Sequence, residues 1–153
     1  MEYNLDMTTK ADKTYVDIFF ALVNAEVRLW DKLDAALKQA DLSLSLARFL
    51  ALYHLSEQPL RLQDLAHRCL AKESAASRLA ERMYRDGLIA KSSDAQDGRA
   101  VMLHLTPKGQ QLEKRALEVF HSHLKTIFED YGTKELKTSL ELLSPLLEAG
   151  NHD

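Results

Sequence analysis

The sequence has little of what holds small disulfide-rich, fibrous or membrane proteins together. Its one cysteine, Cys69, cannot form a disulfide within the chain and suits a reducing compartment. Five glycines and three prolines are too few for a collagen-like or linker-rich chain, and they disfavour strand-dense folds, which need many turns. No apolar run approaches the roughly 20 residues of a membrane span, and the polar N-terminus is unlike a secretory signal. We therefore expect a soluble, cytoplasmic protein with no membrane partner.

The composition that is present favours one globular domain with appended helices. Of 153 residues, 46% are hydrophobic and 28% are charged. The net charge of −3 is unevenly distributed: residues 1–60 and 109–153 each carry −3, whereas residues 61–108 carry nine Lys/Arg against six Asp/Glu, or +3. A basic segment between acidic ends is typical of a module that binds a polyanion on an acidic scaffold. Chance explains an imbalance of this size about as well.

Apolar residues recur every three or four positions along most of the chain, which predicts helices. The first predicted helix would be roughly 40 Å long, more than a small domain needs to cover its own core, and such helices usually pack against a partner. Ser45 and Thr106 are the expected N-caps, and Gly87 is an expected C-cap. The predicted helices cover residues 12–40, 45–55, 61–71, 74–86, 107–131 and 133–147.

A β-hairpin is predicted between the fourth and fifth helices. The segment 100–106 alternates in polarity with a period of two, which is typical of a half-buried strand, and 88–92 is short and apolar at its start. The polar loop SDAQDG lies between them. Three helices followed by a hairpin predict a winged helix-turn-helix, so the fold class is mainly α with a small β-hairpin wing (α+β).

The helix predicted at 74–86 carries the features of a helix that reads DNA. Arg78 and Arg82 lie one turn apart on its polar face, and the small residues Ser74, Ala75 and Ser77 allow a close approach to the major groove. The alternative is an ordinary surface helix whose arginines form weak surface ion pairs. The hairpin that follows favours the DNA-binding interpretation.

Residues 61–112 resemble the MarR family, the multiple-antibiotic-resistance type of winged-helix transcription regulator. The most specific matches are Ser77-Arg78, the run R-D-G-L-I from Arg85 to Ile89, and the run L-x-L-T-x-x-G that ends at Gly109. The sequence D-x-R at Asp97-Gly98-Arg99 completes them. With the flanking helices, the resemblance covers about nine-tenths of the chain.

The resemblance implies a homodimer that binds a palindromic operator in double-stranded DNA. It implies that residues 1–40 and 110–153 form a helical dimerisation region, in which the first and last helices interlock. Residues 41–109 would be the winged helix-turn-helix domain. We therefore expect a sequence-specific transcriptional regulator, of the ligand-responsive repressor type, and not an enzyme.

The resemblance also assigns roles within the wing. It implies that Asp97 pairs with Arg99 and that this arginine enters the minor groove. Gly98 stands where the family often has a second basic residue, and Ala47 where it often has an aromatic one. These departures reduce the expected phosphate contact at the wing tip and alter one wall of a ligand pocket.

A ligand is implied by the family alone: many relatives bind a small aromatic or phenolic carboxylate between the dimerisation helices and the DNA-binding domain. Residues that could line such a crevice are Trp30, Arg48, Tyr53 and His54. Aromatic residues on apolar stripes are, however, more often ordinary core residues. Neither the ligand nor the operator can be named from the sequence.

Other kinds of site are not indicated. No histidine has another at the i, i+4 spacing and no H-E-x-x-H motif occurs, so we expect no metal and no cofactor. Cys69 is interpreted as a small buried residue rather than an oxidant sensor. The alternative function is a helical protein-interaction adaptor, or an enzyme, without DNA binding. Salt-dependent binding to duplex DNA would distinguish the two.

Overall fold

The computed structural model describes residues 10–40, 42–94, 97–98 and 100–148. The chain divides into two units, Met1–Phe120 and His121–Asp153, and the division falls within one helix. Within the described ranges, no helix is both long and apolar enough to cross a membrane.

The first unit contains four complete helices in the order that the sequence predicts. They are α1 (Lys10–Gln39), α2 (Leu46–Glu57), α3 (Leu62–Arg68) and α4 (Glu73–Arg85). The Ser45 side chain accepts a hydrogen bond of 3.3 Å from the Arg48 amide and so caps α2, as predicted. The carboxylate of Asp34 in α1 accepts a 2.7 Å hydrogen bond from the Leu46 amide, and this contact ties α1 to the start of α2.

The predicted hairpin is confirmed, and a third strand joins it. The strands β1 (Leu60–Arg61), β2 (Ile89–Ser93) and β3 (Val101–Leu105) form an antiparallel sheet in the order β1-β3-β2. Residue Ile89 pairs with Leu105, and Leu60 pairs with Leu103. The sequence could not reveal β1, because two residues show no alternation and these two border a helical pattern.

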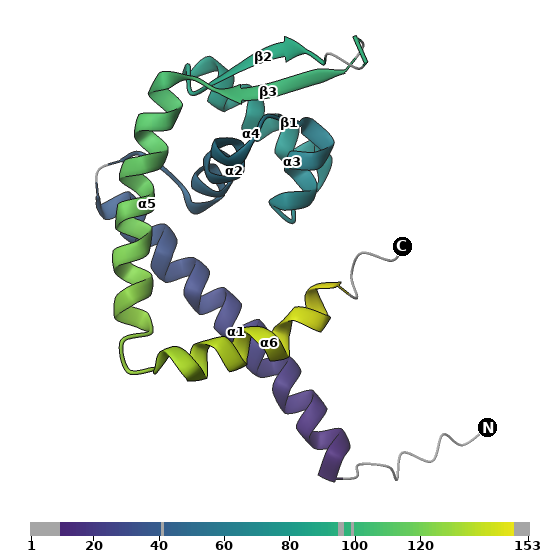
Figure 1. The fold of residues 1–153 in the computed structure, drawn as a ribbon, viewed down its shortest axis with the longest axis vertical. Coiled ribbons are helices and arrows are strands. Elements are labelled where there is room, and N and C mark those ends of the chain that lie inside the picture. The colour runs from purple at the N-terminus through teal and green to yellow at the C-terminus, as the bar shows by residue number, and fades with distance from the viewer. Residues whose placement is uncertain (1–9, 41, 95–96, 99, 149–153) are drawn as a thin grey trace, which may run out of the picture. The chain divides into compact units, whose positions relative to one another are not determined.

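The core of the first unit lies where α2, α3 and α4 pack on the sheet (Figure 1). Its largest buried side chains come from the helices, the hairpin and the loop before α2, and the rings of Phe49 and Phe120 are 4.8 Å apart. This core fixes the orientation of α4 relative to the wing. Side chains that are essentially inaccessible to solvent are Phe49, Leu37, Leu44, Leu52, Leu65, Met83 and Ile89.

Helices α3 and α4 end in the same hydrogen-bonding pattern. At α4, the Gly87 amide donates to the Tyr84 carbonyl and the Leu88 amide donates to the Met83 carbonyl, with Gly87 at φ +72°. This is a Schellman motif, and it confirms the predicted C-cap. Helix α3 closes in the same way, but Leu70 occupies the left-handed position, with φ 51°. The helix therefore ends at Arg68 instead of continuing to residue 71 as predicted.

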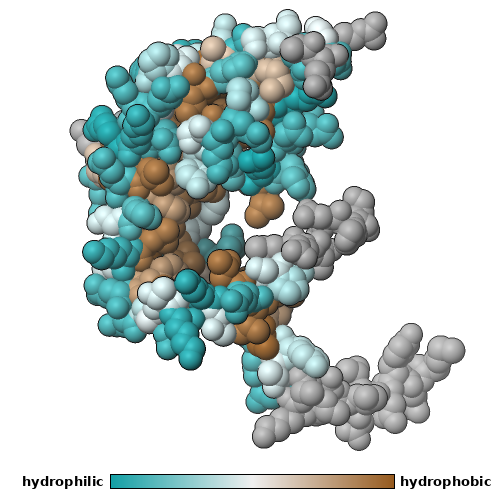
Figure 2. Space-filling view, in the orientation of Figure 1, coloured by the Kyte–Doolittle hydropathy of each residue, from teal (hydrophilic) through white to brown (hydrophobic). Residues whose placement is uncertain are grey.

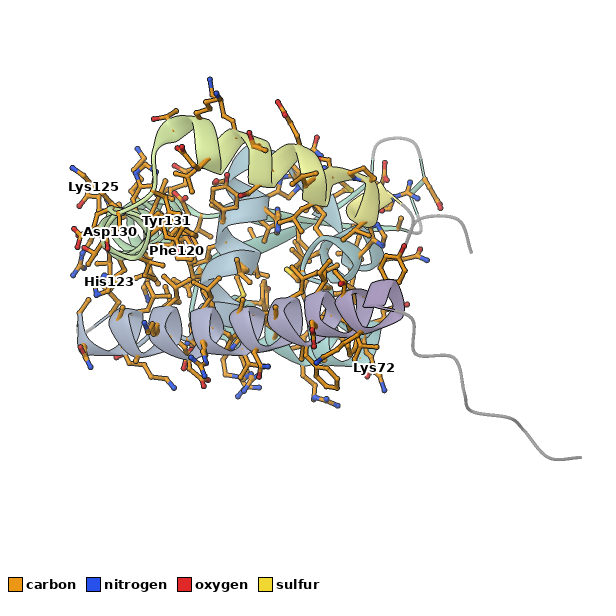
Figure 3. The ribbon with its side chains drawn as sticks, turned by 90° about the horizontal axis from the view of Figure 1, so that it is seen from below. Lys72, Phe120, His123, Lys125, Asp130 and Tyr131 are labelled. Atoms are coloured by element: carbon orange, nitrogen blue, oxygen red, sulfur yellow. The ribbon has the colours of Figure 1, made fainter. Side chains whose placement is uncertain are left out.

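Helix α5 (Pro107–Ile127) begins as predicted and ends earlier. The Thr106 hydroxyl accepts a hydrogen bond of 3.1 Å from the Gly109 amide, so Thr106 is the expected N-cap. Residues after Ile127 form a turn instead of the predicted last helical turn, and α6 (Thr133–Glu148) follows in the second unit. Figure 3 looks along α5 and shows His123 and Lys125 projecting from it in different directions.

Large apolar side chains remain exposed on the helices outside the winged domain. On α1, Tyr15, Phe19 and Val27 are each at least half exposed, and on α6 Leu140 and Leu142 are more than 60% exposed. Apolar residues, brown in Figure 2, also gather along α5. A chain that kept these faces in water would be unusually apolar on its surface.

Candidate DNA-reading surface and adjoining pocket

Helix α4 presents a polar face because its opposite face is packed in the core. Ala76, Ala80 and Met83 are buried, whereas Arg78 and Arg82 are exposed. Neither arginine forms an ion pair or a side-chain hydrogen bond within the described part of the chain. Both guanidinium groups are thus available to an external anion.

The N-terminal end of α4 combines the small residues that the sequence analysis selected. Ser74 is exposed, and Ala75 and Ser77 are partly buried. The N-cap position is held by Lys72, which makes no side-chain capping hydrogen bond. Helix N-termini favour anions because their free amides and the helix dipole point outward. The structure therefore brings Ser74, Ser77, Arg78 and Arg82 onto one accessible stretch of one helix.

Two contacts that the sequence analysis did not identify join α4 to strand β2. The Lys91 ammonium bonds to the Glu81 carboxylate and also lies 4.7 Å from the centre of the Tyr84 ring. A cation over an aromatic face at this distance is attractive. These contacts hold the wing against the helix. No local sequence signal pairs residues seven or ten positions apart on different elements, so these two contacts could not be predicted.

The root of the wing is fixed by a second ion pair. Arg61 on β1 donates to the Asp94 carboxylate at 2.7 Å through Nε, and its Nη2 lies 2.5 Å from the same oxygen. This hydrogen bond, reinforced by the charge of Asp94, raises the pKa of Arg61. Asp97 is exposed in the wing, and its charge adds to the same effect. Arg99, the other predicted wing residue, lies outside the described residues.

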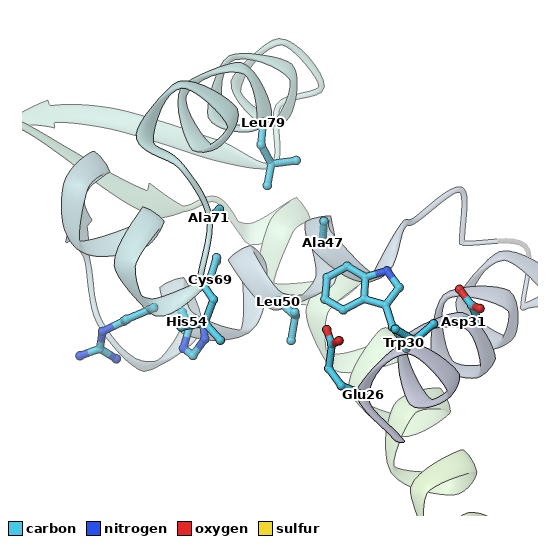
Figure 4. A pocket seen from close by; sticks show the side chains of 12 residues that line it. Glu26, Trp30, Asp31, Ala47, Leu50, His54, Cys69, Ala71 and Leu79 are labelled. Carbon is cyan, nitrogen blue, oxygen red and sulfur yellow. The ribbon is translucent and has the colours of Figure 1, made fainter. Parts of the chain in front are cut away.

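A cavity of about 710 Å³ lies between α1, α2 and the turn that joins α3 to α4 (Figure 4). It contains two of the four predicted ligand residues, Trp30 and His54. Its walls are mostly apolar, and its volume is typical of pockets for small molecules. Leu79 of α4 and Ala47 of α2 also line it. Ala47, at the position where the resemblance implies an aromatic residue, contributes only a methyl group to this wall.

The other two predicted ligand residues lie elsewhere. Arg48 forms a 2.6 Å ion pair with Asp86, the C-cap residue of α4. Arg48 also lines a separate cavity of about 450 Å³. Tyr53 packs its ring against Phe49, at 6.2 Å between centroids, and against His54, at 5.6 Å. Neither Arg48 nor Tyr53 lines the larger cavity. The cationic group that the sequence analysis placed beside Trp30 is therefore absent from that position.

Cys69 is partly buried at the end of α3 and lines the larger cavity. Burial raises the pKa of its thiol, which keeps the thiol protonated and poorly nucleophilic. Its neighbour Leu70 is 95% exposed, because the helix has already ended. Among the described residues, no three His, Cys, Asp or Glu side chains gather as they would around a metal ion.

Comparison with known proteins finds similarity to transcription regulators. The MarR family matches residues 44–101. The uncharacterized HTH-type transcriptional regulator YfiV of Bacillus subtilis (strain 168) is 27% identical over 157 residues, covering 95% of this chain and 86% of the relative. The homoprotocatechuate degradative operon repressor of Escherichia coli is 28% identical over 98 residues, covering 63% and 66%. The fold is similar to the crystal structure of the transcriptional regulator BldR from Sulfolobus solfataricus, with a TM-score of 0.78, 24% identity, and coverage of 94% and 99%.

Proposed function

We propose that the chain is a DNA-binding transcription regulator of the MarR family, which matches residues 44–101, and that it works as a homodimeric, ligand-responsive repressor on a palindromic operator. The observation that carries this proposal is the face of α4, where Arg78 and Arg82 are exposed and unpaired while the opposite face is buried. The protein is proposed to act in the cytoplasm, because its partner is chromosomal DNA.

In this proposal α4 enters the major groove with its N-terminal end. A helix fits the major groove, and arginine is the side chain that most often reads guanine there. Arg78 lies in the second turn of α4, beside the small Ser74 and Ser77, so its side chain is the one expected to reach base edges. Arg82, one turn further along, is expected to contact phosphate.

The wing is proposed to contact the adjacent minor groove. This role falls on Arg99, which is oriented by Asp97 as the family resemblance implies. The Arg61–Asp94 ion pair supports the proposal because it fixes the base of the hairpin from β1. A single arginine at the tip suits a narrow, A·T-rich minor groove, where the negative potential is enhanced.

Dimerisation is proposed to cover the apolar faces of the terminal helices. The exposed residues of α1 repeat at helical spacing over several turns, and α6 exposes leucines along its length. Each helix alone has more apolar surface than its own unit covers. Burying such faces against a second copy, at about 25 cal/mol per Å², would stabilise both partners.

Ligand control is proposed to act through the larger cavity. Its walls include Leu79 of α4 and the turn before α4, so an occupant touches the DNA-reading helix directly. A relative is named for the operon that degrades homoprotocatechuate, an aromatic compound. We therefore propose that this cavity binds a small aromatic ligand and that this binding releases the protein from DNA.

The experiment is selection of bound duplexes from a random pool, followed by anisotropy titrations at several salt concentrations. We expect a two-fold symmetric site, two chains per duplex, and an association constant that falls steeply as salt rises. Arg78→Ala should cost about 1–3 kcal/mol and relax the preference at one position in each half-site. Arg28→Ala, which removes an exposed arginine from α1, is the matched control and should change little.

Each result has a clear opposite. Enrichment of unsymmetric sites, or one chain per duplex, would contradict the dimeric arrangement. An equal loss of affinity for every DNA sequence in Arg78→Ala would show that Arg78 contacts phosphate and not bases. If the protein shifted no duplex at any salt concentration, the helical adaptor would be the better interpretation.

A further inference from the structure

The α1 side of the larger cavity is acidic and aromatic. Glu26 and Trp30 are one turn apart on α1, and Asp31 is the next residue; all three line the cavity. Figure 4 shows the indole ring of Trp30 facing the open space, with Glu26 and Asp31 beside it. Trp30 is 40% exposed, so a face of its ring is accessible to a bound molecule.

Positive charge is not available to balance these carboxylates. Neither Glu26 nor Asp31 has an ion pair within the described residues. The arginine that also lines this cavity, Arg68, forms a 3.2 Å ion pair with Glu57. Arg48 is held by Asp86 at the other cavity. A carboxylate ligand placed beside Trp30 would therefore meet two negative groups and, among the described residues that line the cavity, no unpaired arginine or lysine.

The geometry points to a ligand that carries a positive charge: we propose that this cavity binds a small aromatic or lipophilic amine, with its ammonium group over Trp30 between Glu26 and Asp31. Tryptophan provides the most favourable ring for a cation. The apolar body of the ligand would lie along Val27, Leu50 and Leu79. This inference rests on the proposed ligand control and names the ligand's chemistry.

The proposal departs from the aromatic acid that the family resemblance suggests. What differs is the distribution of charge in this chain: the two acidic side chains border the cavity, and its arginine is already paired. His54, at the same cavity, has a buried Nδ1 with no hydrogen-bond partner in the described structure, since Glu57 lies 3.6 Å away. It is available to a polar group on the ligand and does not require an anion.

The single tryptophan of the chain makes the test direct, because Trp30 reports on this cavity by its own fluorescence. Full-length protein is titrated with benzyltrimethylammonium, phenylacetate and phenylacetamide, which are cationic, anionic and neutral. We expect the cation to bind at least about tenfold more tightly than the anion, from two partly exposed charges and one ring contact. The neutral amide should fall between them.

Variants locate the effect. Glu26→Gln should weaken binding of the cation about threefold and strengthen binding of the anion. Asp17→Asn removes an exposed charge on α1 away from the cavity and should change neither affinity. Trp30→Leu, followed by calorimetry, should lose cation affinity by a similar factor while circular dichroism stays unchanged. Tighter binding of phenylacetate, no response to any probe, or no effect of Glu26→Gln would overturn the proposal.

DNA titrations in the presence of the same probes separate this inference from the proposed function. Release of DNA by phenylacetate but not by the cation would leave ligand control standing and refute the amine. Binding of the cation without release of DNA would support the amine site and refute control through this cavity.

Discussion

Substitutions at the C-terminal ends of α3 and α4 test how much backbone conformation alone contributes to stability. Leu70 and Gly87 occupy the same position of two Schellman motifs, with φ of 51° and 72°. Leu70 is 95% exposed, so its side chain buries almost nothing. A Cβ at Gly87 would meet no atom within 4 Å. Substitution at either site therefore changes backbone preference with little change in packing.

The expected free energies follow from that preference. A left-handed residue with a Cβ costs roughly 1–2 kcal/mol, and glycine loses about 0.5–1 kcal/mol more chain entropy on folding. Leu70→Gly should therefore stabilise the protein by about 0.5–1 kcal/mol. By the same reasoning, Gly87→Ala should destabilise it by about 1 kcal/mol.

Denaturation by guanidinium, with the midpoint and slope fitted for each variant, measures both changes. Protein concentration must be the same throughout, because association shifts the apparent stability. Leu70→Ala is the control: it removes the exposed side chain but keeps the Cβ, so it should resemble the parent. Destabilisation by Leu70→Gly would show that the leucine side chain contributes through contacts, and the conformational argument would fail.

Three further outcomes are expected. Gly109→Ala should destabilise by about 1–3 kcal/mol in thermal melts, because the new Cβ would lie 2.1 Å from the Leu88 carbonyl oxygen; a variant as stable as the parent would show that α5 can shift. Burial raises the pKa of Glu113 above its ordinary 4.5, so the protonated folded state is favoured and stability is lost as pH rises through the folded pKa. Glu113→Gln should therefore be more stable than the parent at pH 7, with a gain that vanishes toward pH 4, and a constant gain across that range would contradict the assignment. Cys69→Ala should retain DNA binding and ligand response under peroxide, and loss of a peroxide response seen in the parent would identify a sensor.

The periodic parts of the fold could be predicted from sequence because their signals are local. Six helices and the hairpin occur where the apolar pattern places them, and the caps at Ser45, Thr106 and Gly87 form as expected. The structure also explains the glycine that ends the L-x-L-T-x-x-G run: Gly109 passes so close to the Leu88 carbonyl that no side chain fits. The two-residue strand β1 was missed, because it depends on pairing with β3.

The candidate site could be proposed from sequence only where one helix supplies it. The polar face of α4 follows from helical spacing, so Arg78 and Arg82 were selected together as candidates. The pocket needs residues from four helices and the turn between α3 and α4. Sequence reasoning grouped Arg48 with Trp30, although α2 presents Arg48 toward Asp86. Which side of a helix faces which neighbour depends on the tertiary fold. For the same reason, the ion pair between Arg61 and Asp94 has no local signature.

Two of the places where local preference and structure disagree lie together. Leu70 is an exposed apolar residue in a conformation that favours glycine, and His54 has a buried nitrogen without a partner. Both border the cavity beside Trp30. Each costs stability, by backbone strain at Leu70 and by an unsatisfied polar atom at His54. Packing within the described residues does not offset either destabilisation. Such uncompensated positions are expected at binding sites. Because Leu70 lies in the turn that leads into α4, an occupant that contacts this turn would act at the start of the helix that we propose reads DNA.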